Sequence, residues 1–223
     1  MSVAFDVVAF DLDGTLADTA DDLAAALNHA LTQMGRPALA LAEVRAMVGH
    51  GTRALMRKGL AATGEVSDAL IDDALPSLTA FYTANICRAT VGYPGVEQAL
   101  DALMAGGARL AVCTNKPEAL ARMLVEALGW GDRFAAIIGG DTLAVAKPDA
   151  APLHEAIARA GGGRAAYVGD SITDADTARA AQFPFVAVSF GFLDRPVSEL
   201  GAAAVIDHYD ALPAALASLA RVT

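Results

Sequence analysis

The chain has 223 residues, enough for one large or two small domains, and 55% of them are hydrophobic. Its formal net charge of −10 argues against a surface for nucleic acid or anionic membranes, which would repel it. No apolar stretch approaches the roughly 20 residues that cross a bilayer. Asp6 interrupts the N-terminal apolar run and no cationic region precedes it, so we expect no signal peptide. Cys87 and Cys113 lack the spacing of a metal site or disulfide framework, which favours a reducing cytoplasm.

The first predicted element is a buried strand over residues 3–12, an apolar run that ends in Asp11-Leu12-Asp13-Gly14-Thr15. Two carboxylates at such close range repel each other unless a cation lies between them. Oxygen ligands favour a hard divalent ion, most simply Mg²⁺. With a metal present, one carboxylate can attack phosphorus while the other carries a proton. The alternative interpretation is an Asp-rich surface turn after a strand.

Residues 17–91 show helical patterns and no strand pattern. Leu23, Leu27, Leu31 and Met34 fall on one helical face. Further helical stretches cover residues 42–48, 52–62 and 67–86, and Pro76 should break or kink the last of them. We expect a helical insertion that joins the rest of the chain near residues 17–19 and 88–93. Two connections to a rigid core suit a lid that closes over a site.

A loop with two glycines, Gly49-His50-Gly51-Thr52-Arg53, precedes one of these helices. Backbone N–H groups at a helix N-terminus can face an anion. Arg53 lies in the first turn, which is unfavourable for a cation unless an anionic group is close. We hypothesise that Gly49, His50, Gly51 and Arg53 contact the non-phosphate end of a substrate, for example a carboxylate. The alternative is an ordinary helix–helix turn with a solvated arginine, and the role of His50 stays open.

Strand and helix patterns alternate from about residue 92 onward, which predicts an α/β fold with a doubly wound parallel sheet and helices on both faces. The first strand belongs to the same sheet. The expected strands cover residues 109–114, 135–139, 165–170, 185–190 and 203–206. The expected helices cover residues 96–105, 118–128, 151–160, 173–181 and 211–220.

Polar residues follow two of these strands. Thr114 and Asn115 can donate to a phosphoryl oxygen, although a polar turn would look the same. Lys116 is expected to be solvated. Asp170 ends another strand, and Asp174 falls in the following helix, where an acid is also favoured by the helix dipole. Lys147, taken alone, is typical of an exposed surface lysine.

Taken in chain order, four segments resemble the motifs of the haloacid dehalogenase superfamily of phosphohydrolases. They are Asp11-Leu12-Asp13-Gly14-Thr15, Thr114-Asn115, Lys147-Pro148 and Gly169-Asp170-Ser171-Ile172-Thr173-Asp174. The resemblance implies that Asp11 is the nucleophile and forms an aspartyl-phosphate, and that Asp13 is the acid and base. It implies a Mg²⁺ ion held by Asp11, Asp170 and the backbone carbonyl of Asp13. Lys147 would offset phosphoryl charge, and Asp174 would bind a metal water or orient Lys147.

The same resemblance implies a catalytic core of residues 1–16 and 92–223 and a helical cap of residues 17–91. Thr114-Asn115-Lys116-Pro117, Ile138-Gly139-Gly140-Asp141-Thr142-Leu143 and Val48-Gly49-His50-Gly51 are similar to bacterial phosphoglycolate phosphatases, which often carry Asn in place of His50. This similarity implies hydrolysis of a small phosphorylated metabolite, 2-phosphoglycolate, to glycolate and phosphate. Whether the protein is a monomer or homodimer stays open.

Other functions stay open. Relatives hydrolyse other small phosphates, such as a muramic-acid sugar phosphate (N-acetylmuramate 6-phosphate) or pyrophosphate, and a sugar phosphomutase keeps both acids of the first motif. A dehalogenase would not need Asp13. A binding module without catalysis gains nothing from clustered unpaired acids, so Asp11, Asp13, Lys147 and Asp170 argue against it.

Overall fold

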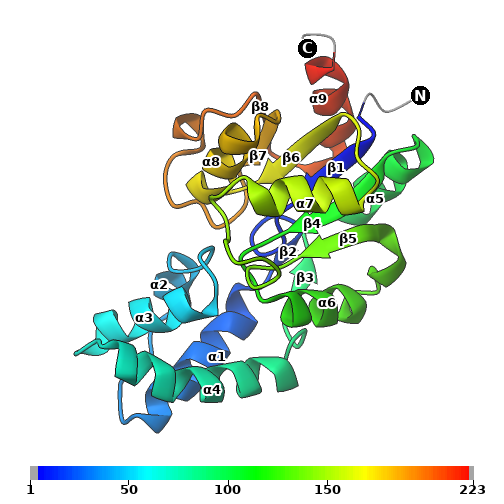
Figure 1. Ribbon diagram of the computed structural model, residues 1–223. Coiled ribbons are helices and arrows are strands. Elements are labelled where there is room, and N and C mark those ends of the chain that lie inside the picture. Colours follow the sequence, from blue (N-terminus) through cyan, green and yellow to red (C-terminus); the bar gives the residue numbers. More distant parts are fainter. Residues whose placement is uncertain (1–4, 221–223) are drawn as a thin grey trace.

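The computed structural model describes residues 5–220, so residues 3 and 4 of the first predicted strand lie outside the described part. Its main sheet has six parallel strands in the order β5-β4-β1-β6-β7-β8 (Figure 1). These strands are β1 (Val7–Phe10), β4 (Arg109–Cys113), β5 (Phe134–Ile138), β6 (Ala165–Gly169), β7 (Phe185–Val188) and β8 (Ala204–Ile206). The predicted parallel α/β sheet is confirmed.

Helices cover both faces of this sheet. The side chains of Val8 and Phe10 enter one hydrophobic core and those of Val7 and Ala9 enter the other, as the two-residue period of a strand requires. Helices α5 (Val96–Ala105), α6 (Glu118–Ala127) and α9 (Leu212–Leu219) contribute to the first core, and α7 (Ala151–Arg159) and α8 (Ile172–Ala181) to the second. Burial on both faces explains why the strands are continuous apolar runs. Short 3₁₀ turns cover Gly131–Arg133, Val197–Glu199 and Tyr209–Ala211.

The predicted strands and helices after residue 92 agree with the structure to within two residues at each end. The first strand is shorter than predicted, because the chain turns immediately after Phe10. There the carbonyl oxygen of Leu12 accepts hydrogen bonds from the backbone N–H groups of Leu16 and Ala17. Leu12 is still fully buried, so an apolar pattern alone could not locate the end of the strand.

Four helices lie between β1 and β3 and form a bundle beside the sheet (Figure 1). They are α1 (Ala20–Gln33), α2 (Leu41–Arg45), α3 (Thr52–Thr63) and α4 (Asp68–Ala84). Their shared core includes Leu27, Met56, Leu60 and Leu78. Helix α4 continues through Pro76, so a break at that residue was a wrong prediction. Buried side chains on both sides of Pro76 hold the helix against α1 and α3, which offsets the lost backbone hydrogen bond.

A two-stranded antiparallel ribbon, β2 (Ala17–Asp18) and β3 (Val91–Gly92), lies where the bundle joins the rest of the chain. The sequence did not predict these strands, because two residues each are too short to produce a periodic pattern. The division into a core of 1–16 and 92–223 and a cap of 17–91 stays a prediction. We use the name cap segment for residues 17–91.

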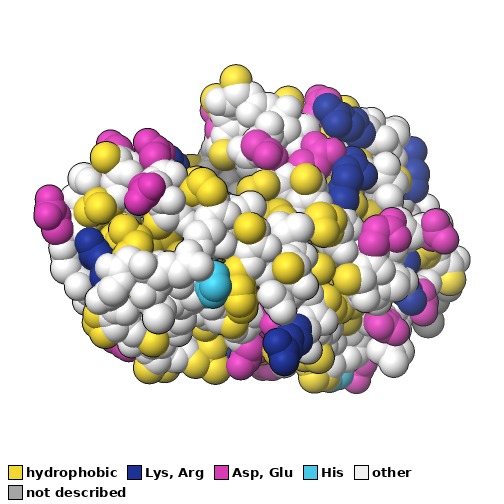
Figure 2. All heavy atoms as spheres, turned by 90° about the horizontal axis from the view of Figure 1, so that it is seen from below, with side chains coloured by type: hydrophobic (Ala, Val, Ile, Leu, Met, Phe, Trp, Pro, Cys, Tyr) yellow, Lys and Arg dark blue, Asp and Glu magenta, His cyan; other side chains and the backbone are white. Residues whose placement is uncertain are grey.

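Strand β1 lies between β4 and β6, so the carboxyl ends of these three strands meet at one edge of the sheet. In doubly wound sheets this edge, where the chain order reverses, is where ligands bind. Within residues 5–220 no helix is both long and apolar enough to cross a membrane. On the face shown in Figure 2, acidic side chains are spread over the surface, and the basic ones stand in separate groups.

Candidate active site

The loop after β1 brings the first two acids into the interior. Asp11 and Asp13 are both buried, and Asp11 Oδ1 lies 3.1 Å from Lys147 Nζ. Gly14 adopts a φ of +82°, and a Cβ atom at this position would lie 2.4 Å from Asp170 Oδ2. Only glycine combines this backbone conformation with such a close approach. Gly14 thus lets the loop return directly over the end of β6.

Asp170 follows β6 and faces the same loop. Its Oδ1 accepts a hydrogen bond from Thr15 Oγ1 at 2.7 Å, and its Oδ2 accepts one from the Phe192 backbone N–H at 2.6 Å. Burial, together with the negative charges of Asp174 and Asp11, raises the pKa of Asp170 well above its ordinary value. Burial also raises the pKa of Asp11 to about 7, although Lys147 acts in the opposite direction. For Asp11, burial therefore outweighs the nearby positive charge of Lys147.

Lys147 is held by three oxygen atoms in the interior. Its ammonium lies 2.7 Å from Asp174 Oδ1, 2.9 Å from the Tyr167 hydroxyl and 3.1 Å from Asp11 Oδ1. Burial alone would lower its pKa, but the attraction of Asp11 and Asp174 outweighs burial and holds the pKa above the ordinary value. The sequence-based alternative of an exposed surface lysine is wrong, since the residue is 5% exposed.

Asp174 is positioned by the start of α8. Its Oδ2 accepts hydrogen bonds from the backbone N–H groups of Asp170 and Ser171 and from Ser171 Oγ. Burial acts to raise the pKa of Asp174, but Lys147 and these hydrogen bonds lower it below its ordinary value. One oxygen of Asp174 thus caps the start of α8 and the other contacts Lys147.

The acidic cluster fits a divalent cation. Asp11, Asp170 and Asp174 are all buried, and one oxygen of each lies within 4.8 Å of the others. The ammonium of Lys147 pairs with two of these three carboxylates, Asp11 and Asp174, which leaves excess negative charge in a medium of low polarity. An all-oxygen donor set of this kind suits a hard cation. Burial, followed by the charges of neighbouring carboxylates, raises the pKa values of both Asp11 and Asp170.

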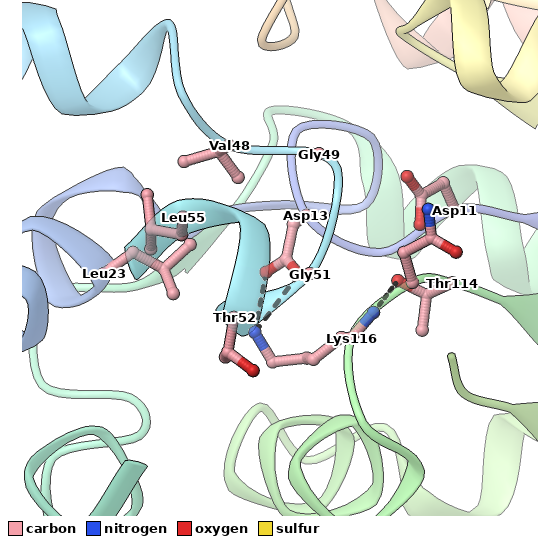
Figure 3. A pocket seen from close by; sticks show the side chains of 11 residues that line it. Asp11, Asp13, Leu23, Val48, Gly49, Gly51, Thr52, Leu55, Thr114 and Lys116 are labelled. Atoms are coloured by element: carbon pink, nitrogen blue, oxygen red, sulfur yellow. Dashed lines mark hydrogen bonds and ion pairs between the residues drawn. The ribbon is translucent and has the colours of Figure 1, made fainter. Parts of the chain in front are cut away.

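A pocket lies between the strand ends and the cap segment (Figure 3). Asp11, Asp13, Thr114, Asn115 and Lys116 line it from the sheet side. Asn115 Nδ2 donates to the Lys147 carbonyl oxygen at 3.3 Å, and Asn115 Oδ1 is buried without a hydrogen-bond partner among the described residues. The cap side of the pocket consists of Leu23, Val48, Gly49, Gly51, Thr52 and Leu55.

Lys116 is buried, at 3% exposure, where a solvated side chain was expected. Its ammonium donates to Asp13 Oδ1 at 2.9 Å and to the Tyr82 hydroxyl at 2.8 Å. Its backbone N–H donates to Thr114 Oγ1, so the chain turns sharply after β4 and directs the side chain inward (Figure 3). Nothing in the local pattern indicated the inward direction of the Lys116 side chain or the role of Tyr82, which lies near the end of α4.

The loop residues expected to bind substrate separate into two groups. Gly49 and Gly51 line the pocket, whereas His50 and Arg53 are not among its lining residues. His50 Nε2 lies 3.5 Å from Thr173 Oγ1, and Nδ1 lies 3.4 Å from Lys58 Nζ. The Arg53 side chain is 47% exposed and pairs with Asp72 and Asp68 on α4. These acids satisfy the cation in the first turn of α3, which removes the reason for a substrate contact by Arg53.

The geometry thus brings the carboxylates of Asp11 and Asp13, the buried ammonium groups of Lys116 and Lys147 and the acidic cluster together at one edge of the sheet. Residues 8–188 match the family model described as haloacid dehalogenase-like hydrolase. The chain belongs to this hydrolase family. It is 48% identical over 214 residues to a phosphoglycolate phosphatase of Mesorhizobium japonicum, which covers 95% of this chain and 94% of the relative.

A further relative and two solved structures are also similar to this chain. The phosphoglycolate phosphatase of Caulobacter vibrioides is 44% identical over 95% of this chain and 91% of its own length. The crystal structure of a predicted phosphoglycolate phosphatase from Haemophilus somnus superposes with a TM-score of 0.88 at 28% identity, covering 94% of this chain and 96% of that one. A structure of CbbY from Rhodobacter sphaeroides, 22% identical and with a TM-score of 0.81 over 96% of this chain and 99% of that one, shares the fold.

Proposed function

We propose that the protein is a phosphomonoester hydrolase whose substrate is 2-phosphoglycolate, which it converts to glycolate and phosphate. The observation that carries the proposal is the buried Asp11 at 3.1 Å from Lys147, at a pocket that Asp13 also lines. Relatives that share 41–48% of their residues over most of this chain are named phosphoglycolate phosphatases, which supports the choice of substrate.

In the proposed reaction, an Asp11 carboxylate oxygen attacks phosphorus and the phosphoester bond to the leaving oxygen breaks. Asp13 gives its proton to the departing alkoxide, which leaves as the alcohol. Asp11 then carries the phosphoryl group as an acyl phosphate. Asp13 next takes a proton from water, whose oxygen attacks phosphorus and restores the Asp11 carboxylate with release of phosphate.

Three further side chains would stabilise the transferring phosphoryl group. Lys147 offsets its negative charge from a fixed position, since Asp174 and Tyr167 already hold the ammonium. Thr114 and Asn115 follow β4 at the same pocket and offer a hydroxyl and an amide to its oxygens. Because these donors are fixed before the substrate arrives, little reorganisation is needed during the reaction.

We propose Mg²⁺ as the cation, held by the carboxylates of Asp11 and Asp170 and by the backbone carbonyl of Asp13. When bound, the ion would neutralise phosphoryl charge and the excess charge of the acidic cluster. Asp174 would position Lys147, since Lys147, Tyr167 and Ser171 occupy both of its oxygens. The cap segment would close over the pocket and exclude water during the first step.

The test is Mg²⁺-dependent phosphate release from 2-phosphoglycolate, several sugar phosphates including N-acetylmuramate 6-phosphate, pyrophosphate and a chromogenic aryl phosphate. We expect kcat/KM for 2-phosphoglycolate to exceed the others, and Asp11→Asn to lower kcat by on the order of 1,000-fold or more. Asp176→Asn is the matched control, because Asp176 pairs with Arg179 at the surface.

If the other phosphates are hydrolysed and 2-phosphoglycolate is not, the proposed substrate is wrong and the proposed hydrolase activity stands. Undiminished turnover by Asp11→Asn would reject the nucleophile. Phosphoryl transfer from a sugar phosphate to a second sugar hydroxyl, with little phosphate released, would replace the hydrolase by a phosphomutase.

A further inference from the structure

Lys116 stands apart from the other cation of the site. Lys147 contacts Asp11 and Asp174 in the acidic cluster, whereas Lys116, which follows β4, contacts Asp13 on the pocket side. Among the described residues that line the pocket, Lys116 is the only cation. The two buried ammonium groups therefore mark two places where negative charge can be held.

Two residues, Asp13 and Tyr82, contact the buried ammonium of Lys116. Its ammonium lies 2.9 Å and 3.2 Å from the two oxygens of Asp13 and 2.8 Å from the Tyr82 hydroxyl. The Tyr82 ring also lies under the ammonium, whose nitrogen is 4.5 Å from the ring centroid. An ammonium has three N–H groups. Asp13 Oδ1 and the Tyr82 hydroxyl accept two of them, and the third makes the longer contact to Asp13 Oδ2, which a ligand in the pocket can replace.

The opposite side of the pocket favours an anion as well. Helix α3 has twelve residues and begins at Thr52. Its N-cap residue is Gly51, and no N-cap side chain accepts a hydrogen bond from the first turn. Both residues line the pocket together with Lys116 (Figure 3). Backbone N–H groups and the helix dipole at this end stabilise negative charge. Of the remaining cap residues at the pocket, Leu23, Val48 and Leu55 have apolar side chains and Gly49 has none, so their side chains offer no competing donors.

We propose that Lys116, together with the first turn of α3, binds a second anionic group of the substrate, namely the carboxylate that lies beside the phosphoester. Lys116 is then the residue that selects carboxylated phosphomonoesters over neutral ones of the same size. This inference rests on the proposed function. It assigns to Lys116 the contact that the sequence alone suggested for Arg53.

The spacing of the pocket suits a short substrate. Thr114, Asn115 and Lys116 are consecutive, so the proposed phosphoryl donors and the proposed carboxylate partner belong to one turn after β4. A Cβ atom on Gly51 would lie 2.9 Å from the Asn115 carbonyl oxygen, so the cap loop contacts this same turn. A ligand bound at both places spans only a few atoms.

The experiment compares 2-phosphoglycolate with 2-hydroxyethyl phosphate, which has a hydroxymethyl group in place of the carboxylate. The readout is the ratio of the two kcat/KM values. Wild type should favour 2-phosphoglycolate, and Lys116→Met should reduce the ratio by about tenfold or more, the usual effect of losing one charge-assisted hydrogen bond. Arg53→Met is the matched control, since it removes a cation of the cap segment outside the pocket, and its ratio should match wild type.

Two further variants guard against misfolding and against an effect through Asp13. Lys116→Gln keeps a donor without the charge and should also reduce the ratio, while Lys116→Arg should restore part of it. Thermal unfolding of each variant confirms that it is folded. A fall that is equal for both substrates would overturn the inference, because Lys116 would then act only on Asp13.

The two proposals fail in different ways. If wild type shows no preference for 2-phosphoglycolate, the proposed substrate is wrong and Lys116 has no carboxylate to select. If wild type shows the preference and both Lys116→Met and Lys116→Gln retain it, the substrate stands and only the role of Lys116 is overturned.

Discussion

Excess negative charge is the main electrostatic feature of the individual site residues. Asp11 and Asp174 share the ammonium of Lys147, Asp170 lies beside them, and burial raises the pKa of Asp11 to about 7. An aspartate with the ordinary pKa of 3.8 would be ionised throughout the neutral range. The site is therefore prepared for a cation, and its charge balance makes the stability of the metal-free protein depend on pH.

The first prediction concerns this dependence. Because the pKa of Asp11 is raised on folding, the folded protein binds more protons than the unfolded chain between its ordinary value of 3.8 and about 7. The unfolding free energy of the metal-free protein therefore falls as pH rises through this window. With a chelator present, we expect Tm to be lower at about pH 7.5 than at about pH 5, by on the order of 5 °C.

Added Mg²⁺ should recover most of this loss at the higher pH. Asp11→Asn should reduce the pH dependence, whereas Asp176→Asn should retain it. A Tm that is unaffected by pH and by Mg²⁺ in the wild-type protein would contradict the charge balance proposed for the cluster.

At the scale of elements, the start of α3 controls how the cap segment meets the sheet. Gly51 has a φ of +83°, and a Cβ atom there would lie 2.9 Å from the Asn115 carbonyl oxygen. Gly49 in the same loop has a φ of +108° and open space around it. The two glycines thus separate the effect of backbone strain from the effect of contact with the core.

The second prediction uses this pair. Gly51→Ala should lower kcat/KM by on the order of tenfold or more, since a displacement of about 1 Å in a closed site is costly. Gly49→Ala introduces the conformational strain without a contact to the Asn115 turn, so its kcat/KM should fall much less. Steady-state kinetics with 2-phosphoglycolate provide the measurement. Equal losses in both variants would attribute the effect to strain.

At the scale of the whole molecule, Asp22 fastens the two connections of the cap segment to each other. Asp22 lies in α1 close to the first connection, and its Oδ2 accepts hydrogen bonds from the Ala89 and Thr90 backbone N–H groups and the Thr90 hydroxyl in the second. Asp22 and Thr90 are both buried. The ribbon of β2 and β3 lies next to these contacts along both connections. The two connections are therefore held to each other at one end of the cap segment.

The third prediction is that Asp22→Ala lowers the unfolding free energy by about 1–3 kcal/mol, because buried donors are left without an acceptor. Urea denaturation measures the change. Asp21→Ala serves as the control, since Asp21 is the exposed neighbour on the same helix. A loss of the same size in both variants would point to helix propensity or the helix dipole instead of the buried contact.

Much of this architecture could be predicted from the sequence, because its signals are local. Apolar runs that end in Asp11, Thr114 and Asp170 located three strands of the sheet, and the strand–helix alternation gave its class. The assignment of Asp11, Asp13, Lys147 and Asp170 to catalysis came from the order of the motifs, and their roles stay predictions. The ribbon of β2 and β3 and the unbroken α4 were missed, because pairing and packing outweighed weak local patterns.

The sequence by itself determined the parallel α/β class and the positions of the acids along the chain, since both follow from local periodicity and from which residues end each strand. Tertiary structure alone decided that β1 lies between β4 and β6, that Lys116 turns inward to Asp13 and that Arg53 pairs with α4 at the surface. The physical reason is the long separation along the sequence between residues that meet in the fold. Asp13 and Lys116 are separated by 103 positions, and only the folded topology brings such distant charges into a buried site, where each needs a partner.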